Sequence, residues 1–377
     1  MLGTMKTSLY VRSNDGASLR NRMSVCLQIW PLKPINTTAF CIPKGQTLYS
    51  SSLMRHSPAP SEHLEPLCNV ALASDPATMD KAVRTLSRGG LVAIPTETVY
   101  GLAAALNSKV AVAKIFSVKD RPQDHPLIVH IAQIEQLHKV AEEISADALK
   151  IAHACWPGPI TLLLRRSESV PTSVTGGRET VAVRIPDNTF TRQLINNMGS
   201  PIVAPSANRF GKVSPTTAQH VCDDLQGDVD LIVDDGACSI GVESTIMDFS
   251  VSPPQLLRPG GIPVEDIEHI LGYEIQSSDG ISRASGMLQS HYRPSCQVIL
   301  SQNELEATQL FERLTPQQLP ARILNRCNNL PLYASSLYND LRQADADQLR
   351  TLIAILPKNS GLGAAIIDRL TKAAAPI

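Results

Sequence analysis

Stretches of helical and strand-like apolar spacing alternate along most of the chain, from about Asp75 to Leu271. Helices are predicted between Asp75 and Gly89 and over 109–117, 134–143, 146–155, 188–197, 216–225 and 264–271. Strands are predicted over 91–95, 127–131, 161–164, 180–185, 202–204, 231–233 and 244–249. Because helices and short strands are interleaved, the pattern predicts an α/β fold with a mixed twisted sheet.

A second, smaller unit follows a break in this pattern. Residues 277–290 are rich in Ser and Gly and are typical of a linker. Beyond them a strand is predicted over 297–300 and helices over 335–344 and 362–373. We therefore predict a main domain over 75–275, a linker over 276–294 and a small C-terminal α/β domain over 295–377, which the length of 377 residues allows.

The first 74 residues differ from the rest in composition. Positions 1–60 hold seven Lys or Arg residues and one acid, Asp15, and their periodicity is weak. Such a segment is typical of an organellar transit peptide. A disordered tail and a start codon assigned too early, with Met54 as a candidate true start, are the alternatives.

Charge, cysteines and hydropathy narrow the class of protein. The net charge of −1 gives no global positive field that would attract nucleic acid. The eight cysteines are widely spread and form no C-x-x-C pair, which argues against a disulfide scaffold or a structural zinc site and favours a reducing, cytoplasmic location. No apolar run approaches the ~20 residues of a spanning helix, so we expect no membrane segment.

The common nucleotide-binding loops are missing from the sequence. Gly211-Lys212 is followed by Val213 and lacks the earlier glycine of a phosphate-binding P-loop. Gly361 and Gly363 do not extend to a full G-x-G-x-x-G. A nucleotide, if bound, is therefore held by other residues.

Two polar stretches follow predicted strands in the first half of the main domain. The first, 94–102, places Thr96, Glu97 and Thr98 where α/β proteins commonly bind ligands, although a Ser/Thr-rich turn is an alternative. The second, 119–130, presents Lys119 and Arg121, which suit a polyphosphate, or else form a solvated turn. His130 ends an apolar strand, and taken by itself it is better explained as a satisfied core histidine than as a ligand.

Two more polar stretches follow. On a strand, Thr180 and Arg184 share one face, and an arginine in an apolar strand is costly unless it meets an anion. Residues 204–216 offer small hydroxyls and backbone amides that could hold a phosphate or ribose, and a plain helix cap at Ser214 is the alternative. Arg258 adds a cation in a tight turn.

Taken in order, these stretches resemble the YrdC family, and specifically its larger two-domain threonylcarbamoyl-AMP synthases. The resemblance covers 77–272, a linker motif at 285–294, and the second domain near 337–345 and 361–370. It implies a YrdC-like twisted mixed sheet with flanking helices, plus a small Rossmann-like α/β domain that looks shorter than usual. The linker would act as a lid over the nucleotide.

The resemblance also implies an activity. L-Threonine, bicarbonate and ATP, with Mg²⁺, would give threonylcarbamoyl-AMP and pyrophosphate, for threonylcarbamoylation of adenosine in tRNA. A downstream threonylcarbamoyl-transferase complex would receive the product, and weak RNA binding is a further expectation. Import into an organelle through residues 1–74 remains an alternative to a cytoplasmic location.

Two sets of site residues follow from the family pattern. The implied threonine contacts are Thr98, His130, Arg184, Ala204 and Ser244. The implied ATP contacts are Lys119, Arg121, His125, Thr180, Ser206, Ser214, Arg258 and Tyr292, with Lys119 and Arg121 assisting catalysis. His125 stands where the family usually has Asn, so the geometry of that contact differs.

Two rival classes remain. A carbamoyl-adenylate enzyme of hydrogenase maturation also contains a YrdC-like region, but its cysteine-rich zinc motifs have no counterpart here. A non-enzymatic RNA-binding module is disfavoured by the net charge of −1 and by the aromatic content of 4%. Salt-dependent RNA affinity without ATP turnover would support that second class.

Overall fold

The computed structural model describes residues 68–277, 292–314 and 319–375. All of them belong to one compact unit, His63–Ile377. Most of the predicted tail, residues 1–67, and most of the predicted lid, residues 278–291, lie outside the described residues.

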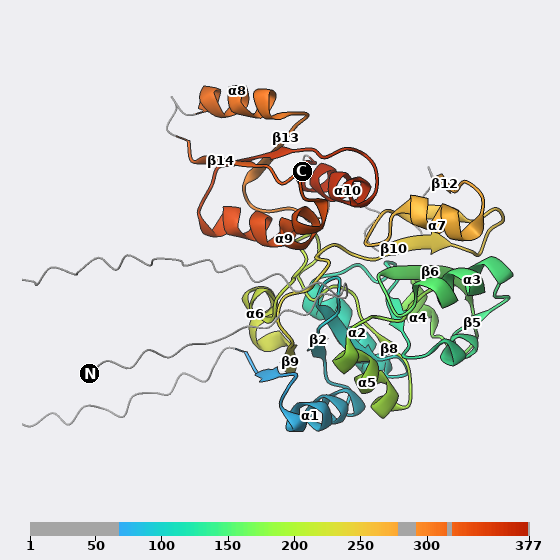
Figure 1. The fold of residues 1–377 in the computed structure, drawn as a ribbon. Helices are drawn as coiled ribbons and strands as arrows, with labels where there is room; N and C mark the ends of the chain where they lie inside the picture. Colours follow the sequence, from blue (N-terminus) through green and yellow to red (C-terminus); the bar gives the residue numbers. More distant parts are fainter. Residues whose placement is uncertain (1–67, 278–291, 315–318, 376–377) are drawn as a thin grey trace, which may run out of the picture. The chain divides into compact units, whose positions relative to one another are not determined.

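A large mixed sheet forms the main domain (Figure 1). Its twelve strands are β1 (Val70–Leu72), β2 (Val92–Ile94), β3 (Gly101–Ala105), β4 (Ile128–His130), β5 (Ala141–Glu142), β6 (Ile160–Arg166), β7 (Thr180–Arg184), β8 (Ile202–Val203), β9 (Leu231–Asp234), β10 (Thr245–Asp248), β11 (Gln255–Arg258) and β12 (Gln276–Ser277). The order is β1-β9-β2-β3-β8-β4-β7-β6-β10-β11-β12, and β5 pairs with β6. The predicted α/β class and mixed sheet are confirmed.

Helices flank this sheet, and several of them begin at a residue whose side chain caps the first turn. They are α1 (Pro76–Ser87), α2 (Lys109–Lys119), α3 (Ala146–Cys155), α4 (Thr172–Thr175), α5 (Thr189–Met198), α6 (Ala218–Leu225) and α7 (Val264–Leu271), with short 3₁₀ segments η1 (Ile134–Lys139) and η2 (Gln226–Asp228). Asp75 caps α1 by accepting a hydrogen bond from the Ala77 amide at 2.9 Å, and Pro76 occupies the first turn. Local chemistry therefore sets this helix start as predicted.

Both faces of the central strands are buried. In β2 and the residue before it, Leu91 and Ala93 belong to one hydrophobic cluster, while Val92 and Ile94 belong to another. Successive side chains of a strand point to opposite faces. The continuous apolar run in the sequence is thus explained by helices on both sides of the sheet.

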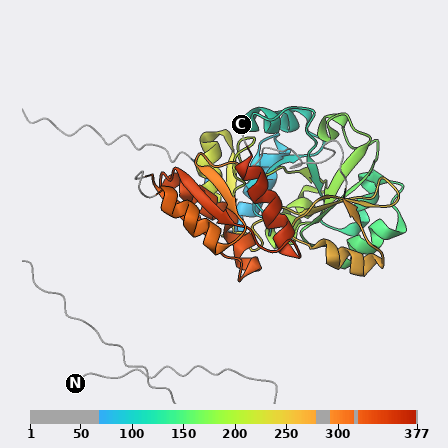
Figure 2. The same cartoon turned by 90° about the horizontal axis from the view of Figure 1, so that it is seen from above.

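The second domain is a three-stranded parallel sheet with helices on both faces (Figures 1 and 2). Its elements are β13 (Gln297–Ser301), α8 (Glu304–Leu314), β14 (Ala321–Leu324), α9 (Leu330–Ala346), β15 (Thr351–Ile355) and α10 (Leu362–Ala374), with the strand order β13-β15-β14. Ile353 and Ile355 of β15 pack with α8, whereas Leu352 and Ala354 pack with α9 and α10. The predicted small α/β unit is confirmed, although β14, β15 and α8 were not predicted.

Strand β1 lies before Asp75, where the sequence pattern placed the start of the main domain. Strand β1 pairs in parallel with β9 at the edge of the sheet, with Val70 opposite Ile232. A three-residue strand is too short to give a periodic signal, and its partner lies far along the chain. The helix predicted over 134–143 is also wrong at its end, because η1 stops at Lys139 and β5 follows.

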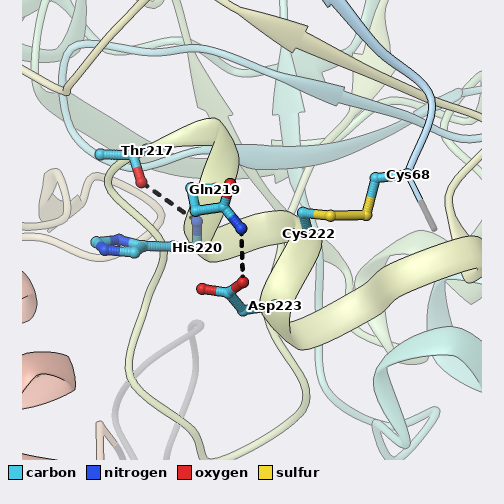
Figure 3. The surroundings of a disulfide bond; sticks show 6 residues. All are labelled: Cys68, Thr217, Gln219, His220, Cys222 and Asp223. Carbon is cyan, nitrogen blue, oxygen red and sulfur yellow. Dashed lines mark hydrogen bonds between the residues drawn. A yellow bond between two sulfur atoms is a disulfide. The ribbon is translucent and has the colours of Figure 1, made fainter. Parts of the chain in front are cut away.

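A disulfide joins Cys68 to Cys222, across 154 positions of sequence (Figure 3). The sequence argued against a disulfide scaffold, and it did not predict this disulfide. Cys68 lies just before β1 and Cys222 lies on α6, so the fold and not the sequence spacing brings them together. Among the described residues, no helix is long and apolar enough to cross a membrane.

Candidate active site

The ends of neighbouring strands bring the predicted site residues together. Strands β4 and β7 are parallel, and their register places His130 directly beside Arg184. Strand β8 runs antiparallel to β4, and the amide of Ala204, just beyond its end, donates to the Ile128 carbonyl at 3.1 Å. Because successive side chains of a strand alternate between the two faces, this register places Ile128, His130, Arg184 and Ala204 on one face of the sheet.

A small cavity opens on this face. It is lined by Thr96, Thr98, Val99, Gly101, Arg121, Ile128, His130, Arg184, Ala204, Pro205, Ser206, Glu243, Ser244, Arg258 and Tyr292. All five predicted threonine contacts are among them, together with four of the predicted ATP contacts, Arg121, Ser206, Arg258 and Tyr292. Its volume of about 50 Å³ equals that of a few water molecules.

Arg184 is held rigidly at the cavity wall. Its Nη2 lies 2.7 Å from Glu97 Oε1, its Nη1 donates to Thr98 Oγ1 at 2.8 Å, and its Nε donates to the Gly158 carbonyl at 3.2 Å. The side chains of Arg184 and Glu97 are only 5% and 8% exposed. An arginine in an apolar strand was expected to need an anion, and Glu97 is that anion. The guanidinium also borders the cavity.

The loop after β2 fixes Thr98 beside this arginine. Thr96 Oγ1 accepts hydrogen bonds from the amides of Thr98 and Val99, both at 3.2 Å, and donates to the Val99 carbonyl at 2.6 Å. The Ser/Thr-rich turn proposed as an alternative is therefore present, and it serves to position a cavity residue.

His130 is neutral at physiological pH. It is buried, and its pKa is lowered to about 3 by burial and by the nearby charge of Arg184. Its Nδ1 lies 3.2 Å from the Ile128 carbonyl, and in the tautomer that donates there, Nε2 is an acceptor. The cavity thus contains a hydrogen-bond acceptor that does not repel a cation.

The opposite wall comes from β10 and β11. Arg258 Nη2 donates to the Ser244 carbonyl at 2.8 Å and to Ser244 Oγ at 3.2 Å, and Ser244 Oγ also lies 2.7 Å from Thr161 Oγ1. Arg121 donates to the Pro126 carbonyl at 3.0 Å, and burial lowers its pKa to about 10, which leaves it charged. Two cations therefore border the cavity besides Arg184.

The other predicted ATP contacts lie outside the cavity wall that the described residues form. Lys119 is buried, and its ammonium donates to the carbonyls of Ser206, at 2.5 Å, and Asn208. Burial lowers the pKa of Lys119 well below its usual range. Lys119 thus holds the backbone of the polar stretch 204–216 in place. Its contact with phosphates remains a prediction.

Three further members of the predicted ATP set have identifiable surroundings. His125 packs edge-on against Phe210 with ring centroids 5.2 Å apart, and burial lowers its pKa. Thr180 lies at the start of β7, whereas Arg184 lies at its end. Ser214 does not cap a helix, because α6 begins at Ala218 with Thr217 as its cap. The contacts of these residues with ATP also remain predictions.

Two carboxylates in this region were not among the predicted contacts of threonine or ATP. Glu97 anchors Arg184, as described above. Glu243 lines the cavity and accepts a hydrogen bond from Ser214 Oγ at 2.7 Å. Acidic residues inside otherwise apolar, strand-flanking segments are the signal that could have identified both.

The comparisons with known proteins agree with this geometry. The profile of the Sua5/YciO/YrdC family, described as telomere recombination, matches residues 84–260, and the profile of the threonylcarbamoyl-AMP synthase C-terminal domain matches 262–375. Threonylcarbamoyl-AMP synthases of Pyrococcus abyssi and Bacillus subtilis are 40% and 38% identical to the chain over 311 and 328 residues. These alignments cover 76% and 80% of this chain and 91% and 94% of the relatives.

A solved structure is similar as well. The crystal structure of P. abyssi Sua5 complexed with L-threonine is 37% identical, with a TM-score of 0.76, and the match covers 81% of this chain and 97% of that one. The chain belongs to the Sua5/YciO/YrdC family, and within it to the two-domain threonylcarbamoyl-AMP synthases.

Proposed function

We propose that this chain converts L-threonine, bicarbonate and ATP into threonylcarbamoyl-AMP and pyrophosphate. One observation carries the proposal: Thr98, His130, Arg184, Ala204 and Ser244 line a single cavity. The P. abyssi relative was crystallised with L-threonine, which supports the same substrate here. The product would serve the threonylcarbamoylation of adenosine in tRNA.

The cavity offers a partner for each polar group of threonine. Arg184 is the cation that suits the carboxylate. The neutral His130 can accept a hydrogen bond from the amine or the hydroxyl through Nε2. Thr98, Ala204 and Ser244 combine small hydroxyls with a methyl group and suit the side chain of threonine.

The reaction requires positioning and charge neutralisation more than a nucleophilic residue. Threonine nitrogen and bicarbonate give a carbamate with loss of water. A carbamate oxygen then attacks the α-phosphorus of ATP, and the bond to the β-phosphate oxygen breaks as pyrophosphate leaves. Arg121 and Arg258, both at the cavity wall, would offset the negative charges of the carbamate and of the ATP phosphates as the two approach each other.

Mg²⁺ would enter with ATP. Within the described residues, no group of three or more His, Cys, Asp or Glu side chains could hold a metal ion. Glu97 and Glu243, the carboxylates nearest the cavity, are already engaged by protein donors. This donor set fits an ion that keeps its waters and is held by the phosphates of ATP, where it would supply additional positive charge.

The test is steady-state pyrophosphate release. Release should require both threonine and bicarbonate, and Arg121→Ala should reduce it strongly. Arg165→Ala is the matched control, because Arg165 is 59% exposed and pairs only with Glu143 in the described structure. Equal release with and without bicarbonate would contradict the proposed reaction.

The wider context is also part of the proposal. The product is an activated acyl-adenylate, so a threonylcarbamoyl-transferase complex that acts on tRNA would have to consume it. Weak RNA binding and a cytoplasmic site of action are further parts of the proposal. A Cys68–Cys222 pair that is reduced in the isolated cellular protein would agree with this location.

A further inference from the structure

Glu243 connects the cavity wall to the second domain. Its Oε1 accepts a hydrogen bond from Ser214 Oγ at 2.7 Å, and its Oε2 accepts from Tyr338 OH at 2.6 Å and from Arg369 Nε at 2.7 Å. Ser214 belongs to the main domain, whereas Tyr338 and Arg369 lie on α9 and α10. Ser214, Tyr338 and Arg369 are each fully buried.

Arg369 also supports the aromatic part of the wall. Its guanidinium carbon lies 5.3 Å from the ring centre of Tyr292, which lines the cavity. The Tyr292 ring stacks on Tyr338 with centroids 5.5 Å apart. The second domain therefore reaches the cavity through one cation and one aromatic ring, both placed against cavity residues.

Glu243 is ionised in this environment. Burial alone would raise its pKa, but the charges of Arg369 and Arg258 and hydrogen bonds from Tyr338 and Arg369 outweigh burial and lower the pKa to about 2. A negative charge in the wall of a cavity that receives a polyphosphate would repel it unless a fixed cation offsets the charge.

We propose that Arg369 is a positioning residue for ATP. By neutralising Glu243 from the second domain, it allows this carboxylate to line the cavity and hold Ser214 behind it without repelling the phosphates. The inference rests on the proposed function, because it assumes that ATP enters this cavity. In this proposal the second domain contributes electrostatically to the binding of ATP.

The contact between the two domains is tight enough for this role. Gly241, two residues before Glu243, has a φ of +76°, and a Cβ added there would lie 2.5 Å from Ser335 Cα on α9. Only a glycine fits such a close approach of two backbones. A displacement of α9 would therefore move the segment that carries Glu243.

The test compares charge variants by calorimetric titration with the α,β-methylene analogue of ATP. Arg369→Met should weaken analogue binding by roughly tenfold or more, the effect of a nearby unit charge at an effective dielectric constant near 20. In the Glu243→Gln background, the same Arg369→Met change should have almost no effect, since no carboxylate is left to neutralise. An equal loss in both backgrounds would overturn the inference.

Arg342→Met is the matched control. Arg342 forms a second bridge between the domains, to Asp224 at 2.6 and 3.0 Å, and neither residue lines the cavity. This variant should leave analogue binding unchanged. A loss as large as that of Arg369→Met would instead assign the effect to docking of the domains in general and would refute the electrostatic role.

Two measurements keep the test decisive. If thermal melting shows that the Arg369→Met single variant does not fold, Glu243→Gln and Glu243→Gln/Arg369→Met still must bind the analogue equally, and a large difference overturns the inference. A wild-type protein that binds the analogue but releases no pyrophosphate would refute the proposed reaction alone. The comparison of the Arg369 variants would still stand.

Discussion

Replacing Arg184 by alanine should damage both ligand binding and stability, for different reasons. The guanidinium borders the cavity, so its loss removes the proposed partner of the threonine carboxylate. The same change leaves Glu97, whose side chain is 8% exposed, without the cation 2.7 Å from its Oε1. The remaining described partner of this carboxylate is the Asp187 amide, at 3.0 Å from Oε2.

The two losses have different sizes. A charge-assisted hydrogen bond contributes about 1.5–3 kcal/mol, which corresponds to roughly 10- to 150-fold in the dissociation constant for threonine. Leaving one partner of a buried ion pair unpaired costs about 3–5 kcal/mol of folding free energy. At roughly 2 °C per kcal/mol for a protein of this size, the melting temperature should fall by about 5–10 °C.

A double variant separates the two effects. Calorimetric titration with L-threonine and thermal melting should be run on wild type, Arg184→Ala and Glu97→Gln/Arg184→Ala. The double variant should regain most of the lost stability, since no unpaired charge remains, but it should not regain threonine affinity. Threonine binding at wild-type strength in the double variant would refute the assignment of Arg184 to the carboxylate.

The remaining predictions test other parts of the structure. Arg258→Ala should weaken binding of an ATP analogue by about tenfold and threonine less, and equal losses for both ligands would contradict the separate roles. Serine should support slower pyrophosphate release than threonine, because a lost methyl group is worth roughly 1–3 kcal/mol, and equal rates would argue against a pocket for the methyl. The pKa of His130 is about 3 in the folded protein, so the unfolded chain binds the extra proton below its ordinary pKa near 6.5, and stability should fall with decreasing pH through that window. At pH 4.5 the resulting loss of unfolding free energy, relative to neutral pH, is about 3 kcal/mol. Urea unfolding of His130→Gln should therefore show a weaker pH dependence than that of the wild type. Finally, Cys68→Ser/Cys222→Ser should unfold at lower denaturant than the oxidised wild type, by about 2–4 kcal/mol, and match the wild type measured with reductant.

The sequence by itself determined the local structure and the inventory of the site. Asp75 with Pro76 fixed the start of α1, and apolar runs of the right length identified most strands of the main domain. Thr98, His130 and Arg184 lie in or beside predicted strands, and the resemblance to the YrdC family implied that they belong to one site. These features depend on residues close together in the chain, so a single sequence contains them.

The tertiary structure decided which of these residues meet and what neutralises them. The register of β4 against β7 places His130 beside Arg184, and the loop after β2 supplies Glu97 as the partner of that arginine. Glu243 and Arg369 are 126 positions apart. Nothing in the periodicity of either segment signals their pairing.

Short and distant pairings were hidden for the same reason. Strand β1 has three residues and depends on β9 for its hydrogen bonds, and Cys68 reaches Cys222 only once both segments are packed. Likewise, Lys119 appears in sequence as a free cation, yet in the fold its ammonium is bound by two backbone carbonyls. Local patterns record what a segment prefers, whereas the partner of a buried charge or strand edge is set by the packing of the whole chain.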